Sequence, residues 1–238
     1  MGDTSKEMAT NIKQVRNSVC GLLRVHHVSG NQYNVAIVGT AWCVIRNHYF
    51  VTAYHVLNNG QARNQNDKFF ILRAPENGPK LERTPVVAFT FEDQACDYAI
   101  LEINRQEGAT LVFDALTIYT GQVEDGTKVL TYGYPSPKVS RAGINKQGQL
   151  IGINTVLLSH GNEGIVASQY AQGQYHMYEL NVGWHHGESG GPILILNPPR
   201  VLAIMQRYKN ISTPHGTVAG PHLGVSIEAI SSQIANLS

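Results

Sequence analysis

Residues 187–192 read Gly-Glu-Ser-Gly-Gly-Pro, a serine enclosed by glycines and followed by the apolar run 193–196. Glycine has no Cβ atom, so a tight turn here exposes the Ser189 hydroxyl and lets the amides of Gly187 and Ser189 point at one spot. Two amide donors at one spot stabilise a negatively charged oxygen. The hexapeptide therefore indicates a reactive serine with its own oxyanion hole, held beside a strand.

Two further segments supply the groups that such a serine needs. A serine hydroxyl is a weak nucleophile, and it requires an imidazole to remove its proton and a carboxylate to orient that imidazole. His55 follows a strand-like run in Phe-Val-Thr-Ala-Tyr-His-Val-Leu (50–57), and Asp97 opens Asp-Tyr-Ala-Ile-Leu-Glu-Ile (97–103). His55, Asp97 and Ser189 are therefore the predicted catalytic residues.

Short strand-like segments follow one another along most of the chain. They are apolar and rich in β-branched residues, and Gly, Asn, Pro or charged residues separate them. The expected strands are 18–25, 35–45, 49–52, 69–72, 86–91 and 98–103 in a first series, and 128–134, 149–158, 174–180, 193–196, 201–206 and 223–225 in a second. Because strands follow strands without intervening helices, the pattern predicts an all-β protein.

Apolar residues at helical spacing mark the two ends of the chain. They are Met8, Ile12 and Val15 near the start, and Ile227, Ile230, Ile234 and Leu237 near the end. The first set predicts a lead-in helix within 1–17, and the second predicts a closing helix at 226–238. The polar loop 58–67 is expected to be a solvated connection.

Composition excludes several classes of function. Lys and Arg number 18 against 17 for Asp and Glu, so no basic field favours nucleic acid or an anionic membrane. Cys20, Cys43 and Cys96 are an odd set without C-x-x-C spacing, which argues against disulfides and a zinc site and favours a reducing compartment. The polar amino end carries no secretory signal. We expect a cytoplasmic protein with no metal, cofactor, membrane or nucleic-acid partner.

The order His, Asp, Ser with Thr-Ala-x-His, Asp-x-Ala and Gly-x-Ser-Gly-Gly-Pro resembles the trypsin/chymotrypsin superfamily. The nearest branch is the HtrA-like protease domain, here without a PDZ domain, to which 51–59, 97–103 and 128–135 are similar. This resemblance implies a chymotrypsin-like fold of two six-stranded β-barrels. The whole chain, 1–238, would be one protease domain, with the N-terminal barrel at 18–110 and the C-terminal barrel at 111–225. Ser189 would then face His55 and Asp97 across the two barrels.

The same resemblance implies a serine endopeptidase that forms an acyl-enzyme on Ser189. His55 would be the general base and then the acid, Asp97 would orient His55, and the Gly187 and Ser189 amides would form the oxyanion hole. The expected partner is a protein or peptide substrate, together with a regulatory protein, and either of them would activate the enzyme.

A specificity pocket is also implied by the resemblance. The predicted substrate-binding residues are Gly183, Trp184, His186, Gln206, Arg207 and Tyr208. No acidic residue lies at the expected floor near Gly183, so an uncharged or apolar side chain is expected before the scissile bond. Recognition of an acidic or Gln side chain by His215 or His222 is left open, although surface loops are favoured for both.

The turn that carries Ser189 departs from trypsin at one position. Glu188 stands where trypsin has Asp, and the chain has no basic-Ile-Val-Gly-Gly cleavage signal, so activation by a new amino terminus is not expected. His185 and His186 are interpreted as loop residues that line the cleft, and Cys96 as a buried thiol. Two alternatives stay open: a catalytically silent peptide-binding module of the same fold, and a viral polyprotein-processing protease.

Overall fold

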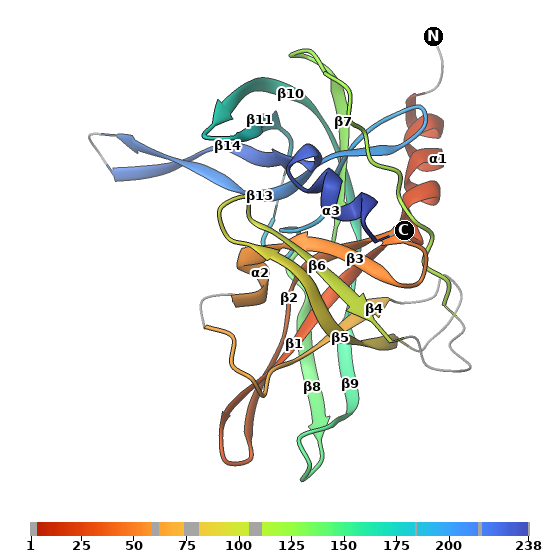
Figure 1. Cartoon of the computed structure of the whole chain (residues 1–238), viewed down its shortest axis with the longest axis vertical. Helices are drawn as coiled ribbons and strands as arrows, with labels where there is room; N and C mark the ends of the chain where they lie inside the picture. Colours follow the sequence, from red (N-terminus) through yellow and green to blue (C-terminus); the bar gives the residue numbers. More distant parts are fainter. Residues whose placement is uncertain are drawn as a thin grey trace.

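The computed structural model describes residues 4–58, 62–73, 81–104, 111–183, 185–213 and 216–237, and it contains two closed barrels of six antiparallel strands each (Figure 1). The N-terminal barrel has the order β1-β2-β3-β6-β5-β4, with β1 at Val19–Ser29, β2 at Gln32–Ile45, β3 at Tyr49–Ala53, β4 at Lys68–Arg73, β5 at Glu82–Asp93 and β6 at Tyr98–Ile103. The C-terminal barrel has the order β10-β11-β14-β13-β12-β7, with β7 at Lys128–Gly133, β10 at His160–Gln172, β11 at Tyr175–Asn181, β12 at Pro192–Ile195, β13 at Arg200–Thr213 and β14 at Gly216–Ser226. The predicted chymotrypsin-like fold is confirmed.

One predicted strand belongs to neither barrel. The segment 149–158 was expected in the second series, but β9 (Leu150–Val156) pairs with β8 (Lys138–Ile144) in a separate two-stranded ribbon. Leu150 packs against buried residues of the N-terminal barrel such as Leu23. A period of two shows that a strand is half buried, but it does not say which sheet the strand joins. The sixth strand of the C-terminal barrel, β10, is too polar to have been recognised.

The helices lie at the chain ends and beside the first barrel. The lead-in helix α1 covers Thr4–Arg16 and buries Val15, as predicted. A short helix, α2 (Tyr54–Asn58), follows β3. The predicted closing helix is present as two short helices: η1 (Ile227–Ile230) is a 3₁₀-helix, and the α-helix α3 (Ser231–Ala235) follows it. Apolar residues spaced three apart suit a 3₁₀-helix as well as an α-helix, so the sequence pattern could not separate the two.

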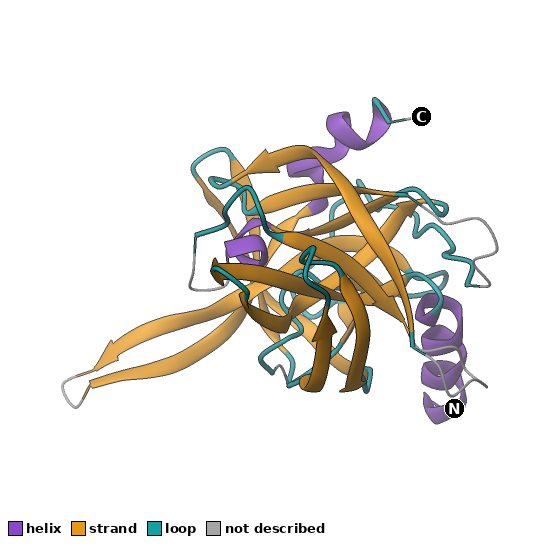
Figure 2. Cartoon of the chain, turned by 90° about the horizontal axis from the view of Figure 1, so that it is seen from below, coloured by secondary structure: helices purple, strands orange, loops and turns teal. Residues whose placement is uncertain are grey.

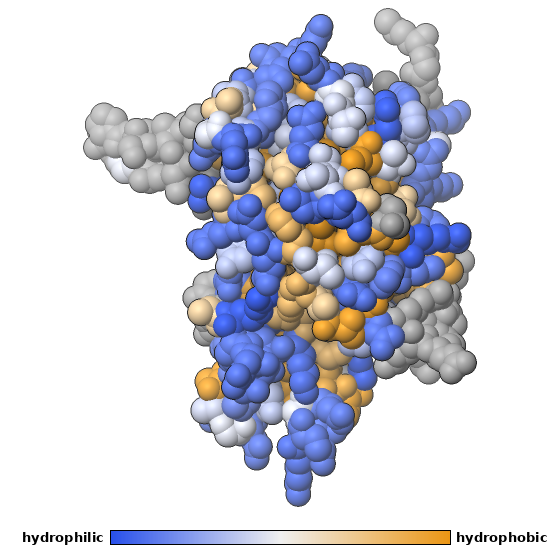
Figure 3. All heavy atoms as spheres, in the orientation of Figure 1, coloured by the Kyte–Doolittle hydropathy of each residue, from blue (hydrophilic) through white to orange (hydrophobic). Residues whose placement is uncertain are grey.

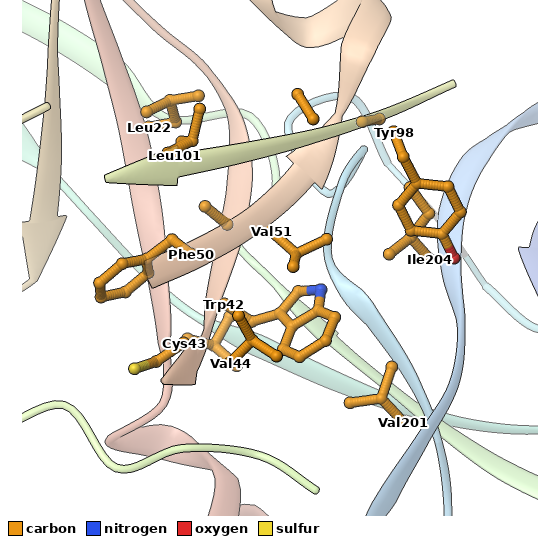
Figure 4. Packing of buried hydrophobic residues seen from close by; sticks show 14 of the residues in the cluster. Leu22, Trp42, Cys43, Val44, Phe50, Val51, Tyr98, Leu101, Val201 and Ile204 are labelled. Atoms are coloured by element: carbon orange, nitrogen blue, oxygen red, sulfur yellow. The ribbon is translucent and has the colours of Figure 1, made fainter. Parts of the chain in front are cut away.

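The largest hydrophobic cluster runs through both barrels. Trp42 and Val51 of the N-terminal barrel belong to the same cluster as Val201 and Ile204 of the C-terminal barrel (Figure 4). The Tyr98 hydroxyl adds a polar link, because it donates a hydrogen bond to a backbone carbonyl of β14 at 2.7 Å. The barrels are thus joined along an apolar seam, which positions residues from both halves against each other.

Hydrophilic side chains cover most of the face shown in Figure 3, and hydrophobic residues show between them. The long β13–β14 hairpin extends away from the barrels (Figure 2). None of the helices in the described ranges is both long enough and apolar enough to cross a membrane.

A buried ion pair fixes the loop before β4. Arg24 Nε and Nη2 donate to Asp67 Oδ2 at 3.0 and 2.6 Å, and the two side chains are only 4% and 0% exposed. Burial alone would raise the pKa of Asp67, but hydrogen bonds from Arg24 and the Asn64 amide bring it below its ordinary value. The expectation of a solvated loop is therefore wrong for its end, because a buried cation on β1 draws the carboxylate inward. Residues 59–61 lie outside the described residues.

Replacing the carboxylate tests this pair. Asp67→Ala is expected to lower the free energy of unfolding by about 3–5 kcal/mol, because the Arg24 guanidinium stays buried without its counter-charge. Urea denaturation measures the change. Asp114→Ala is the matched control, since its pair with Arg46 at 3.8 Å is exposed on both sides and is expected to contribute less than about 1 kcal/mol. Equal losses in the two variants would contradict the assignment.

Candidate active site

His55 and Asp97 form a two-point hydrogen-bonded pair. The His55 backbone amide donates to Asp97 Oδ1 at 2.8 Å, and His55 Nδ1 lies 2.8 Å from Asp97 Oδ2. An ionised carboxylate only accepts hydrogen bonds, so Nδ1 carries the proton and Nε2 is left as the basic nitrogen. The His55 side chain is 45% exposed, so this basic nitrogen is available to a reacting group.

The backbone of Asp97 is held in an unusual conformation. Its φ is +58°, in the left-handed region that few residues other than glycine adopt. The Asp97 carbonyl accepts from the Tyr54 amide at 3.0 Å, which ties the turn before β6 to the start of α2. A constrained backbone of this kind is common at functional sites. It directs the Asp97 carboxylate at His55.

The turn that carries Ser189 is held by Thr40, a buried residue of β2. The Thr40 amide donates to the Ser189 carbonyl at 2.9 Å, and the Thr40 hydroxyl donates to the Gly187 carbonyl at 2.8 Å. The same hydroxyl accepts from the Tyr134 amide at 3.2 Å. These bonds cross from one barrel to the other, so the N-terminal barrel positions a turn of the C-terminal barrel.

Glycine is required at two positions of this turn. Gly187 and Gly190 have φ values of +101° and +82°. A Cβ atom at Gly190 would collide with the Thr40 carbonyl and with Thr52 Oγ1. The expected role of the glycines is thus extended: they allow the turn and also the close approach of the two barrels.

The surroundings of a third glycine, Gly39, show that Ser189 lies near His55. A Cβ atom at Gly39 would lie 2.6 Å from Val56 and 2.9 Å from the Ser189 carbonyl, so the residue after His55 and the serine flank the same point of β2. The Ser189 hydroxyl itself donates to the Gln206 carbonyl at 3.2 Å. Within the described residues, no hydrogen bond joins that hydroxyl to His55. The serine must therefore turn away from Gln206 to reach the imidazole.

The two amides predicted to form the oxyanion hole are open to a ligand. Neither the Gly187 nor the Ser189 amide donates to another group in the described part of the chain. The His186 carbonyl accepts from the Ser136 amide. Because a trans peptide points its carbonyl and its amide in opposite directions, the Gly187 amide points away from Ser136. This leaves the Gly187 amide as a donor for an oxyanion.

Glu188, within the same turn, is fully buried. Its Oε2 accepts from the His185 amide at 2.7 Å, and its Oε1 accepts from Asn162 Nδ2 at 3.3 Å. Burial raises the pKa of Glu188 above its ordinary value, although the His185 amide and the charge of His160 oppose this. The carboxylate thus fixes the loop before the nucleophile through internal partners, in keeping with the expectation that no new amino terminus is needed.

A cavity of about 690 Å³ opens between the barrels beside His55. Two of the predicted substrate-binding residues, Gln206 and Arg207 of β13, line it. Gly183 and His186 are exposed in the loop between β11 and the Ser189 turn, and neither lines the cavity. Trp184 and the side chain of Tyr208 lie outside the described residues.

A closed apolar recess, without room for a water molecule, adjoins this cavity. His222 lines it together with Val182 and Leu223, and its pKa is lowered by burial and by the charge of His185. A neutral imidazole therefore faces the recess at neutral pH. His222 belongs to β14 and is half-buried, so the surface-loop interpretation is wrong for it. His215 lies outside the described residues.

The three cysteines are free and buried. Burial raises the pKa of Cys96, which precedes Asp97, to about 12. The interpretation of Cys96 as a buried thiol agrees with this environment, because a protonated thiol is unreactive.

A family model described as the trypsin-like peptidase domain matches residues 39–204, which is more than half of the chain. The chain belongs to this family. Among solved structures, the crystal structure of Deg5 has a TM-score of 0.66 at 12% identity and covers 98% of this chain and 94% of that chain. The HtrA-type protease AlgW, solved with a decapeptide, has a TM-score of 0.64 at 14% identity and covers 96% of this chain and 66% of that chain. No curated protein sequence matches.

The family match confirms the predicted resemblance to trypsin-like proteases. The likeness to Deg5 and AlgW, at 12% and 14% identity, shows that the fold is shared. Sequence reasoning missed Thr40, Ser136 and Asn162, which hold the turn of this trypsin-like peptidase. Each acts through a contact with a residue far away in the chain, so no local pattern marks it. A threonine in an otherwise apolar strand was the one available signal for Thr40.

Removing the Thr40 hydroxyl tests the link between the barrels. Thr40→Val keeps the branched shape but leaves the Gly187 carbonyl and the Tyr134 amide unsatisfied, at about 1–3 kcal/mol for each buried group. We expect lower stability in urea and a lower kcat. Thr155→Val is the matched control, because that hydroxyl bonds the Lys138 carbonyl in the exposed ribbon. Loss of activity in both variants alike would argue against a specific role for Thr40.

The raised pKa of Glu188 predicts a pH dependence of stability. The folded chain binds the Glu188 proton more tightly than the unfolded chain, so this residue's contribution falls as pH rises from the ordinary carboxyl pKa through the raised one. The glutamine in the Glu188→Gln variant does not titrate. As pH rises across that window, the Tm of the variant should therefore rise relative to the Tm of the wild type. A difference in Tm that is independent of pH would contradict the burial cost assigned to this carboxylate.

Proposed function

We propose that this trypsin-like peptidase is a serine endopeptidase that cleaves peptide bonds through an acyl-enzyme on Ser189. The observation that carries the proposal is the double hydrogen bond of Asp97 to His55, with the Ser189 turn across the seam. The family match supports peptidase chemistry. AlgW was solved with a decapeptide, which supports an extended peptide as the ligand class here.

In the proposed mechanism, His55 Nε2 accepts the proton of Ser189 as the hydroxyl attacks the peptide carbonyl. The C–N bond breaks as His55 returns the proton to the leaving amine, and water then hydrolyses the ester by the same route. Asp97 holds the tautomer that keeps Nε2 basic and stabilises the imidazolium. The amides of Gly187 and Ser189 bind the oxyanion, and no cofactor takes part.

Substrate binding is proposed to align the nucleophile. The Ser189 hydroxyl bonds the Gln206 carbonyl in the free chain, so it must rotate before His55 can take its proton. Catalytic hydrogen bonds that are loose in a free enzyme commonly tighten in the complex. A peptide, or a regulatory protein acting at the same turn, would supply this step. Three free, buried thiols support a reducing compartment such as the cytoplasm.

Ser189→Ala is expected to abolish peptide cleavage and labelling by a fluorophosphonate probe, because no other group can form the acyl-enzyme. Cleavage of a peptide library and gel detection of the probe measure both effects. The Tm of the variant should stay near that of the wild type. Undiminished cleavage by Ser189→Ala would refute the assignment.

Asp97→Asn tests whether Ser189 works as part of a triad with His55 and Asp97 or is merely an exposed serine. The amide favours the wrong tautomer of His55, so kcat should fall by about 10⁴-fold while the fold persists.

The alternative of a catalytically silent peptide-binding module is favoured by the Ser189–Gln206 bond. It predicts that the wild type resists the probe even when peptides are present.

A further inference from the structure

The cavity beside His55 has three walls. One is formed by α2 and the turn before β6, through residues such as Asn58 and Gln94. The second is the β10–β11 turn with Gln172, and the third is the start of the β13–β14 hairpin with Arg207. A volume of about 690 Å³ is large enough for more than one side chain of a peptide.

The cavity lining holds one carboxylate and one guanidinium. Asp97 is the acidic lining residue, and its carboxylate is already engaged by His55. Asp93, on the adjoining turn, accepts from the Ala95 amide. Arg207 is exposed, and it forms no ion pair within the described residues. Its guanidinium is thus not paired with a carboxylate in the described part of the chain.

The rest of the lining contains no further carboxylate, lysine or arginine and is rich in hydrogen-bonding groups. Amides and hydroxyls come from Tyr54, Asn58, Gln94, Gln172 and Tyr175. Such groups can donate to a carboxylate, and a guanidinium can bind it through two parallel N–H groups. A lysine or arginine side chain placed beside Arg207 would be repelled by its guanidinium.

The location links this cavity to the chemistry. Arg207 follows Gln206, whose carbonyl accepts from the Ser189 hydroxyl. His55 lines the same cavity. A side chain bound there therefore belongs to a residue close to the scissile bond of the same peptide.

We propose that the cavity binds an acidic side chain of the substrate and that Arg207 is the residue that selects it. The inference rests on the proposed peptidase function and adds a substrate class, acidic peptides.

Peptides that differ at one position test the selection. A cleavable sequence is varied to Glu, Gln or Lys at each position near the scissile bond. At one position, kcat/KM for Glu should exceed that for Gln by about tenfold, the effect of one charge-assisted hydrogen-bonded pair. The preference should weaken as salt is raised, because screening reduces the attraction.

Reversing the charge at position 207 tests whether Arg207 selects the acidic side chain. Arg207→Glu should reverse the order, so that the Lys peptide becomes better than the Glu peptide. Arg141→Glu makes the same change of charge on the exposed β8 strand and should keep the wild-type order. An unchanged order in Arg207→Glu, or reversal in both variants, would overturn the inference.

Binding to Ser189→Ala keeps this test independent of turnover. Fluorescence anisotropy with the same peptides should give a Kd about tenfold lower for Glu than for Gln. A probe-labelled wild type without any acid preference would refute the substrate class alone. A wild type that resists the probe while Ser189→Ala binds the Glu peptide best would refute the peptidase and support the cavity.

Discussion

Thr40 is the constraint on which the site depends. Its amide and hydroxyl bind the carbonyls of Ser189 and Gly187, and the hydroxyl also accepts from Tyr134. A nucleophile on one barrel can meet a base on the other only if the seam has a single register. An apolar seam alone is non-directional, so the directional bonds of a buried threonine supply that register.

Three carboxylates, those of Asp97, Glu188 and Asp67, have different roles because their surroundings differ. Asp97 is reached by two donors of His55 and sits where its charge can stabilise an imidazolium. Glu188 is buried within the turn and is held by His185 and Asn162, so it acts on the loop rather than on the imidazole. Asp67 stabilises a distant loop through Arg24. Burial and partner, not residue type, give the three groups different tasks.

Local signals were enough for much of the fold. Two strand-rich series predicted both barrels, and Val15 was placed on the buried face of α1. The failures have physical causes. The pattern of β9 fits a half-buried strand in any sheet, and β10 is too polar to read as a strand.

The sequence by itself determined the candidate nucleophile, base and orienting acid, because the glycine turn around Ser189 and the apolar contexts of His55 and Asp97 are local. The tertiary structure decided what connects them: the bonds of Thr40, the partners of Glu188 and the cavity beside Arg207. These depend on distances between strands far apart in the chain. Side-chain periodicity records burial but not which distant residue is the neighbour.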